Sequence, residues 1–72
     1  MARTIFDAVS NIQARKEREG RVPPYATLAE MKRELEGVED GEMYAMLDAE
    51  LLNGMVIRRR TINGYSFQIA EE

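Results

Sequence analysis

The stretch that decides the fold is Leu51-Leu52-Asn53-Gly54-Met55-Val56-Ile57-Arg58-Arg59-Arg60-Thr61-Ile62-Asn63-Gly64-Tyr65-Ser66-Phe67-Gln68-Ile69. It predicts the end of a helix followed by a β-hairpin. Asn53-Gly54 is typical of a left-handed helix C-cap, because glycine adopts a positive φ without strain. Asn63-Gly64 is a strong hairpin signal between two runs of strand-forming residues. We therefore expect strands over residues 55–61 and 65–70.

The register of this hairpin is left open by the sequence. A two-residue loop places the apolar side chains of the second strand on the face of Val56. A three-residue loop, with Gly64 as a bulge, places them on the face of Ile57. We expect the second register, because it pairs Ile57 with Ile69.

A first helix is expected over residues 4–19. Its apolar residues Ile5, Val9 and Ile12 recur at the i, i+4, i+7 spacing of one helical face. Gly20 is a natural stop for this helix. The basic residues near its end suit the negative end of the helix dipole, and we interpret them in this way rather than as a binding patch. They are Arg15, Lys16, Arg18 and Arg21.

A second, shorter helix follows a segment that cannot be helical. Two prolines in residues 21–26 fix φ and remove two amide donors. Thr27 and Glu30 then have the spacing of a capping box, in which each side chain bonds the backbone of the other. We expect Gly37 to end this helix. Its predicted buried face consists of Leu28, Met31 and Leu35.

A third helix is predicted from a cap at Glu39 or Asp40 to about Leu52. We interpret the acidic residues at its start as helix-start charges rather than metal ligands, because the spacing of a calcium loop is missing. Its predicted core face is Met43, Tyr44, Leu47 and Leu51. Its predicted outward face is Glu42, Ala45, Met46, Ala49 and Leu52, flanked by Asp48 and Glu50.

Composition narrows the classes of function. The 72 residues fit one domain, spanning 1–72, and include no Cys and no His. Disulfides, ordinary zinc sites and imidazole catalysis are therefore excluded. No nucleophile with a base and no phosphate-binding loop appears, so we expect neither an enzyme nor a cofactor. No apolar run approaches the ~18 residues of a membrane span, and we expect a cytoplasmic protein.

The formal net charge of −3 hides an uneven distribution along the chain. Residues 1–26 carry five basic and three acidic side chains, whereas residues 27–55 carry two basic and eight acidic ones. Residues 56–72 carry three basic and two acidic side chains. Nucleic-acid modules are usually basic on the binding face. The acidic middle of this chain is unusual for such a module.

Over about residues 4–70 the chain resembles the winged helix-turn-helix family, in particular the amino-terminal domain of LexA repressors. The stretches that carry the resemblance are Ile5-Phe6-Asp7-Ala8-Val9, Gly20-Arg21-Val22-Pro23-Pro24, Thr27-Leu28-Ala29-Glu30-Met31, Leu47 to Leu51, Gly54-Met55-Val56-Ile57 and Gly64-Tyr65-Ser66-Phe67. The resemblance implies an α+β fold of three helices followed by a two-stranded wing over about 55–70. It also implies that the third helix reads DNA and that Arg58, Arg59 and Arg60 lie on the wing.

The third helix departs from the family pattern. Its predicted outward face has no Arg, Lys, Asn or Gln, which are the residues that bond base edges bidentately. The resemblance implies a DNA-binding transcriptional regulator or accessory factor. Because the third helix lacks these donors, we expect its contact with DNA to be weak and to be made through Arg58, Arg59 and Arg60. For these arginines a charged, solvated hairpin edge is the competing interpretation.

The alternative function is a winged helix that binds a protein partner, or a second copy of itself, through the third helix. Ala45, Met46, Ala49 and Leu52 form the apolar stripe that suggests this surface, with Glu42 beside them. Tyr44 and Tyr65 are expected in the core rather than as platforms for stacked bases.

Overall fold

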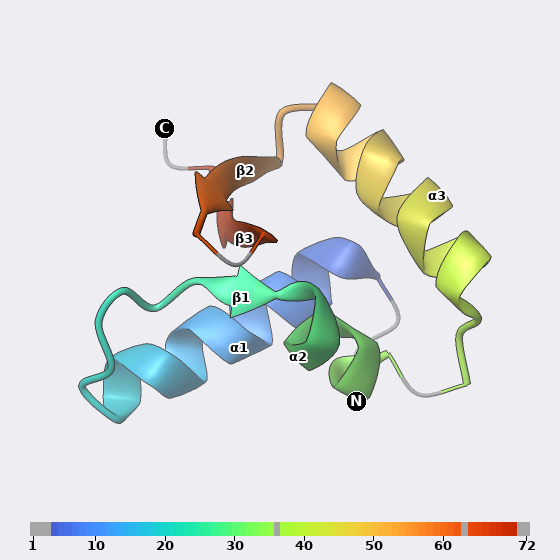
Figure 1. Ribbon diagram of the computed structural model, residues 1–72. Coiled ribbons are helices and arrows are strands. Elements are labelled where there is room, and N and C mark those ends of the chain that lie inside the picture. Colours follow the sequence, from blue (N-terminus) through green and yellow to red (C-terminus); the bar gives the residue numbers. More distant parts are fainter. Residues whose placement is uncertain (1–3, 36, 63, 71–72) are drawn as a thin grey trace.

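The computed structural model describes residues 4–35, 37–62 and 64–70. This part of the chain forms an α+β fold with three helices and a three-stranded antiparallel sheet. The elements in chain order are α1 (Ile5–Arg18), β1 (Ala26–Thr27), α2 (Leu28–Glu34), α3 (Asp40–Leu52), β2 (Val56–Thr61) and β3 (Gly64–Ile69). Figure 1 shows the β2–β3 hairpin above α1, with α3 to the right of both. The predicted order of three helices before a hairpin is confirmed.

The sheet has one strand more than the sequence predicted. Ala26 and Thr27 pair with Phe67 and Ser66, which gives the strand order β1-β3-β2. The expectation of two strands alone was therefore incomplete. Two paired residues are too short to show the alternating pattern by which strands are found in a sequence. The extra strand places β3 in the centre of the sheet and joins the sheet to the start of α2.

The ends of α1 follow the local signals in the sequence. The Thr4 hydroxyl oxygen accepts the Asp7 backbone N–H at 3.1 Å, which satisfies one of the free donors at the helix start. At the other end Gly20 has φ 70°, and its N–H bonds the carbonyl of Glu17 at 3.1 Å. The N–H of Arg21 bonds the carbonyl of Lys16 at 2.9 Å. This pair of bonds is the Schellman motif that glycine favours.

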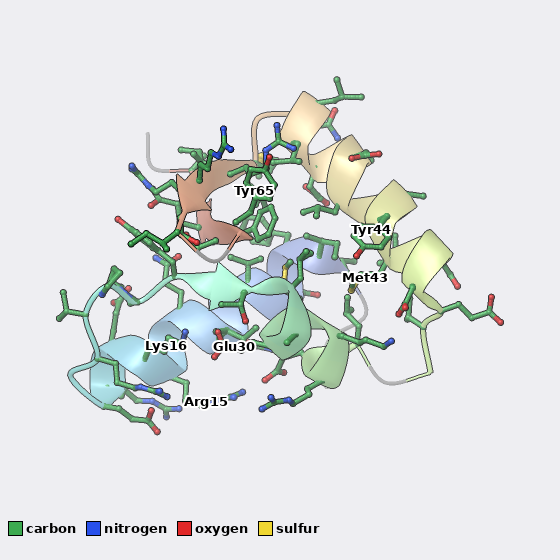
Figure 2. All side chains as sticks on the ribbon, in the orientation of Figure 1. Arg15, Lys16, Glu30, Met43, Tyr44 and Tyr65 are labelled. Carbon is green, nitrogen blue, oxygen red and sulfur yellow. The ribbon has the colours of Figure 1, made fainter. Side chains whose placement is uncertain are left out.

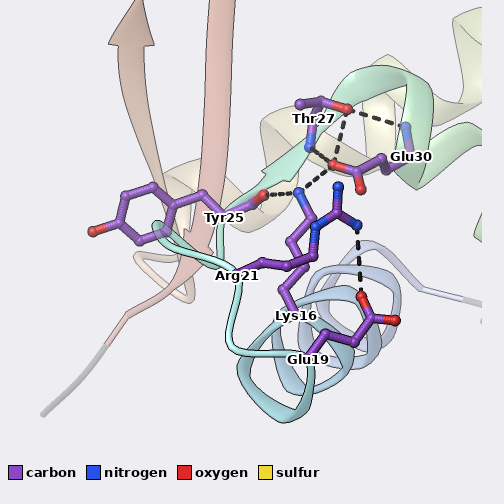
Figure 3. Close-up of polar contacts among 6 residues, drawn as sticks. All are labelled: Lys16, Glu19, Arg21, Tyr25, Thr27 and Glu30. Atoms are coloured by element: carbon purple, nitrogen blue, oxygen red, sulfur yellow. Dashed lines mark hydrogen bonds and ion pairs between the residues drawn. The ribbon is translucent and has the colours of Figure 1, made fainter.

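Thr27 and Glu30 form the predicted capping box, and Lys16 extends it to α1 (Figure 3). The Glu30 carboxylate accepts the Thr27 backbone N–H at 3.1 Å and the Lys16 ammonium at 2.7 Å. The same ammonium donates to the Tyr25 carbonyl at 2.7 Å. One carboxylate therefore links the first helix to the beginning of the second. A second ion pair, between Arg15 and Glu34, joins the same two helices.

The environment of Glu30 changes its acidity. Partial burial raises the pKa of Glu30, but the hydrogen bond from Lys16, the bond from the Thr27 backbone and the charge of Lys16 together outweigh burial. The net result is a pKa below the ordinary value of 4.5. The ionised form of Glu30 is therefore stabilised by folding.

The core lies between α1 and the inner face of the sheet, and α1 contacts α2, α3, β1 and β3. Its buried apolar side chains are Ile5, Ala8, Val9, Ile12, Ala26, Met31, Leu35, Met43, Leu47, Val56 and Phe67. The predicted helix faces of α1 and α2 are confirmed by this cluster, with Leu28 packed partly buried against it. Phe67 is its largest fully buried side chain, and it stands on the central strand.

The rotation of α3 differs from the prediction. Met43 and Leu47 are buried as expected, and Leu51 packs against the core. Tyr44, however, is 49% exposed, whereas Met46 is partly buried against the core. The assignments of Tyr44 to the core and of Met46 to the outward face were therefore wrong. Apolar residues occur around most of α3, so the sequence did not define one buried stripe.

The preferred hairpin register was also wrong. Val56 pairs with Ile69 and Arg58 pairs with Phe67, so the apolar side chains of β3 share the face of Val56. These are the faces of the two-residue alternative, with Thr61 opposite Gly64. Asn63 of the predicted turn lies outside the described residues. The pairing is explained by burial, because it places Val56 and Phe67 together against the core.

Replacing Leu47 with Ala is expected to lower the free energy of unfolding by ~2–5 kcal/mol, because it leaves a cavity in a thin core. The matched control is Leu52→Ala on the same helix, since Leu52 is 89% exposed. Chemical denaturation followed by circular dichroism measures both. Equal midpoints for the two variants would contradict the observed packing of α3.

Replacing Glu30 with Gln is expected to lower stability by about 1 kcal/mol at neutral pH, because the charge that Lys16 binds is removed. Since folding lowers the pKa of Glu30, its contribution is present above pH 4.5 and is lost as the pH falls through the folded-state pKa. The difference between native protein and variant should therefore shrink in acid. Denaturation curves between pH 7 and pH 3 measure it, with the exposed Glu42→Gln as control. A difference that stays constant over this range would refute the role given to Glu30.

Candidate nucleic-acid and protein interfaces

The hairpin distributes its three consecutive arginines over both faces of the sheet. Arg58 pairs with Phe67 and Arg60 with Tyr65, so these two arginines share the inner face of β2. Arg59 pairs with Ser66 and therefore lies on the outer face. All three arginines are exposed. The alternation of side chains in a strand thus prevents the triplet from acting as a single cluster.

Two of these arginines are held against tyrosine rings. The Arg58 guanidinium carbon lies 4.8 Å from the centre of the Tyr65 ring, and that of Arg59 lies 5.4 Å from the Tyr25 ring. Each contact is worth ~0.5–1 kcal/mol at an exposed site. Arg59 also donates from Nε to the Gln68 side-chain oxygen at 2.7 Å. The guanidinium groups of Arg58 and Arg59 are therefore partly fixed in position by contacts within the chain itself.

The positive charge of the hairpin is not neutralised within the described part of the chain. The ion pairs there use Arg15, Lys16, Arg21 and Lys32. None of the hairpin arginines pairs with a described carboxylate. This separates the two groups of basic residues, because those near the end of α1 are largely committed to structure. Their interpretation as a structural pattern rather than a binding patch agrees with these contacts.

Tyr25 and Gln68 are site residues that sequence reasoning missed. Tyr25 belongs to the segment before β1, and Gln68 lies on the central strand next to it. Without β1 in the predicted sheet, nothing placed Tyr25 near Arg59. Tyr65, expected in the core, is instead 44% exposed under Arg58.

The outward face of α3 is apolar at its centre and acidic at its edges. Ala45, Ala49 and Leu52 are exposed, and Leu52 reaches 89% exposure. Glu42 and Asp48 are also exposed. Of the five residues predicted for a partner surface, Met46 is only partly exposed, because it packs against the core. Figure 2 shows Tyr44, which the prediction had placed inside, on α3 together with Met43.

The chemistry of α3 is unsuited to DNA. The helix carries Asp40, Glu42, Asp48 and Glu50 and contains no Arg, Lys, Asn or Gln. Only Asp40 has an ion pair among the described residues, with Lys32. A helix in the major groove needs donors for base edges and a charge that phosphates attract. α3 has neither the bidentate donors nor the positive charge, because its charged side chains are all carboxylates.

The described surface also has a small hollow beside the hairpin. A hollow of about 220 Å³ lies between α1 and the end of β3, where Gln13 accepts the Ile69 backbone N–H at 3.1 Å. Ligand sites usually enclose ~300–1,000 Å³. Over the described ranges, no group of acidic side chains is arranged to hold a metal ion. The described helices include none with the length and apolar character needed to cross a bilayer.

No protein-family model, no curated protein and no solved structure matches this chain.

Proposed function

We propose that the chain is a winged-helix protein that contacts duplex DNA through its β2–β3 hairpin without reading base sequence. The fold is compatible with this assignment, because three helices precede a terminal hairpin and α3 lies next to β2. The family resemblance of the sequence motifs supplies the rest of the argument for the winged helix. Fold likeness alone does not carry a function.

The observation that supports DNA contact is the state of Arg58, Arg59 and Arg60. They are exposed and have no carboxylate partner in the described chain, and two of them rest on tyrosine rings. Guanidinium groups held in this way are suited to bidentate bonds with phosphate oxygens. Because α3 supplies no base-edge donors, binding through the hairpin alone would be weak and would depend on phosphate charge.

The second candidate function is protein binding through α3. The specific observation in its favour is the exposure of Tyr44, Ala45, Ala49 and Leu52 on a helix with no basic residue. Apolar surface of this kind on a small protein commonly marks a contact with another protein. The acidic edges would discourage DNA and favour a basic partner surface.

Measuring DNA binding separates the two candidates. Fluorescence anisotropy with a short labelled duplex at low salt is expected to give roughly micromolar binding that does not depend on sequence. Affinity should fall with salt with a logarithmic slope of about −1.8 if the two arginines that share a face, Arg58 and Arg60, each contact one phosphate. Changing Arg58, Arg59 and Arg60 to Ala should abolish binding.

The matched control removes the same charge from α1, α2 and the segment between them, by changing Arg18, Arg21 and Arg33 to Ala. This variant should bind DNA nearly as well as the native chain if the hairpin makes the contact. Equal loss in both variants would show attraction by net charge alone and would refute the role of the hairpin. Absence of binding by the native chain at low salt would exclude DNA contact and favour the protein-binding candidate.

A further inference from the structure

Two exposed surfaces of this chain have opposite charge, and each includes apolar side chains. The first, called the α3 face, consists of Glu42, Ala45, Asp48, Ala49 and Leu52. The second, called the hairpin face, consists of Arg58, Arg60 and Tyr65. We propose that two copies of the chain associate as a two-fold dimer in which the α3 face of each copy packs on the hairpin face of the other.

The α3 face has a narrow apolar centre between two acids. Ala45 and Ala49 are one helical turn apart and exposed, so a partner side chain can approach the helix backbone closely. Glu42 and Asp48 lie on opposite sides of this alanine pair when the helix is viewed down its axis. They are six positions apart, which is about 9 Å along an α-helix. Both carboxylates are exposed and have no ion pair among the described residues.

The hairpin face has the converse arrangement. Tyr65 pairs with Arg60 across the ladder, and its ring lies under the Arg58 guanidinium at 4.8 Å. Arg58 and Arg60 are alternate residues on one strand, so their α-carbons are about 7 Å apart on the same side. A half-exposed aromatic ring therefore lies beside two exposed arginines, one of which covers its face. Tyr65 remains 44% exposed in the isolated chain.

The charges of the two faces are opposite. In the proposed dimer the Tyr65 ring packs on the exposed Ala45 and Ala49, and the two arginines pair with the two acids. The spacing of the acids and that of the arginines agree within the reach of an arginine side chain. Guanidinium and carboxylate form charge-assisted bonds, often bidentate, which become stronger as an interface excludes water.

The occupant of the α3 face has to come from another molecule. Met43 and Leu47 turn the opposite side of α3 toward the core, so the hairpin of the same copy cannot reach the α3 face. Two α3 faces packed on each other would bring Glu42 and Asp48 of both copies together, and like charges oppose this. A second copy offering its hairpin supplies the missing positive charge. The chain thus carries both halves of the contact.

A two-fold arrangement forms this contact twice. In such a dimer, the α3 face of the first copy contacts the hairpin face of the second, and the two-fold axis repeats this contact with the copies exchanged. No binding surface is left over, so the assembly stops at two copies. A stable interface buries at least about 1,000 Å² in total, or about 500 Å² from each copy. The chain exposes 5152 Å², so the dimer needs roughly a tenth of that surface. Two contacts per dimer can supply this area more readily than one.

The test is the mass of the protein in solution, measured by sedimentation equilibrium from micromolar to millimolar concentration without DNA. A dimer is expected for the native chain. Glu42→Lys with Asp48→Lys should raise the dissociation constant at least tenfold, and so should Arg58→Glu with Arg60→Glu. Combining all four changes in one chain should restore the dimer, because the charges are then exchanged. Mixing the two double variants should give a heterodimer.

The controls place equal charge changes elsewhere. Glu17→Lys with Glu19→Lys, and Arg18→Glu with Arg33→Glu, should leave the dimer intact. Far-ultraviolet circular dichroism verifies the fold of each variant, and recovery of the dimer in the fourfold variant excludes simple unfolding as the cause of dissociation.

A native chain that stays monomeric at millimolar concentration would overturn the proposal. A dimer that persists in Arg58→Glu with Arg60→Glu would overturn it as well, because the hairpin would then not take part. The dimer and the proposed DNA contact would compete for Arg58 and Arg60, but no DNA is present in this experiment, so its outcome does not depend on DNA binding. Failure of the dimer and failure of DNA binding are therefore separate results.

Discussion

The arrangement of the elements depends on the hydrogen bonds and the ion pair that the Glu30 carboxylate makes with Thr27 and Lys16. Thr27 is both the last residue of β1 and the N-cap of α2, and Glu30 accepts its backbone N–H. Lys16 reaches the same carboxylate from α1 and also holds the Tyr25 carbonyl. One anion therefore fixes the edge of the sheet, the start of α2 and the side of α1. It also fixes the backbone of Tyr25, whose ring supports Arg59 on the hairpin.

The molecule separates its charges in space as well as in sequence. α3 is acidic, the hairpin is basic, and Arg15 and Lys16 of α1 are paired with acids of α2. The charge is therefore unevenly distributed over the described surface, although the net charge of the chain is only −3. A surface charged in this way orients an approaching partner by the direction of its field. The basic hairpin is suited to DNA phosphates, whereas the acidic α3 is suited to a basic protein surface.

The parts of the fold that the sequence predicted well are those decided within a few residues. The Thr27–Glu30 capping box and the turns at Gly20 and Gly54 are local, and the structure confirms them. The parts it missed depend on distant packing. Which face of the hairpin is buried is decided by α1, and a two-residue strand such as β1 exists only because β3 is beside it.

In the candidate surfaces, too, the sequence predicted the features that are decided locally and missed those that depend on distant packing. The positions of Arg58, Arg59 and Arg60 on a hairpin were foreseen from turn chemistry. Their tyrosine and glutamine supports were not, because these depend on the register and on β1. The outward face of α3 was foreseen except at Tyr44 and Met46, where both neighbours of the buried stripe were apolar and the sequence gave no reason to prefer one.

The packing of α3 has a consequence for the motions of the backbone. α3 buries only Met43 and Leu47, and its N-cap residue Glu39 makes no side-chain capping bond. α1, in contrast, buries four residues and has a capped start. Regions with few buried contacts open locally at a lower free energy than the rest of a protein. The amide hydrogens of α3 should therefore exchange with solvent sooner than those of α1, through openings that leave the remainder of the fold in place.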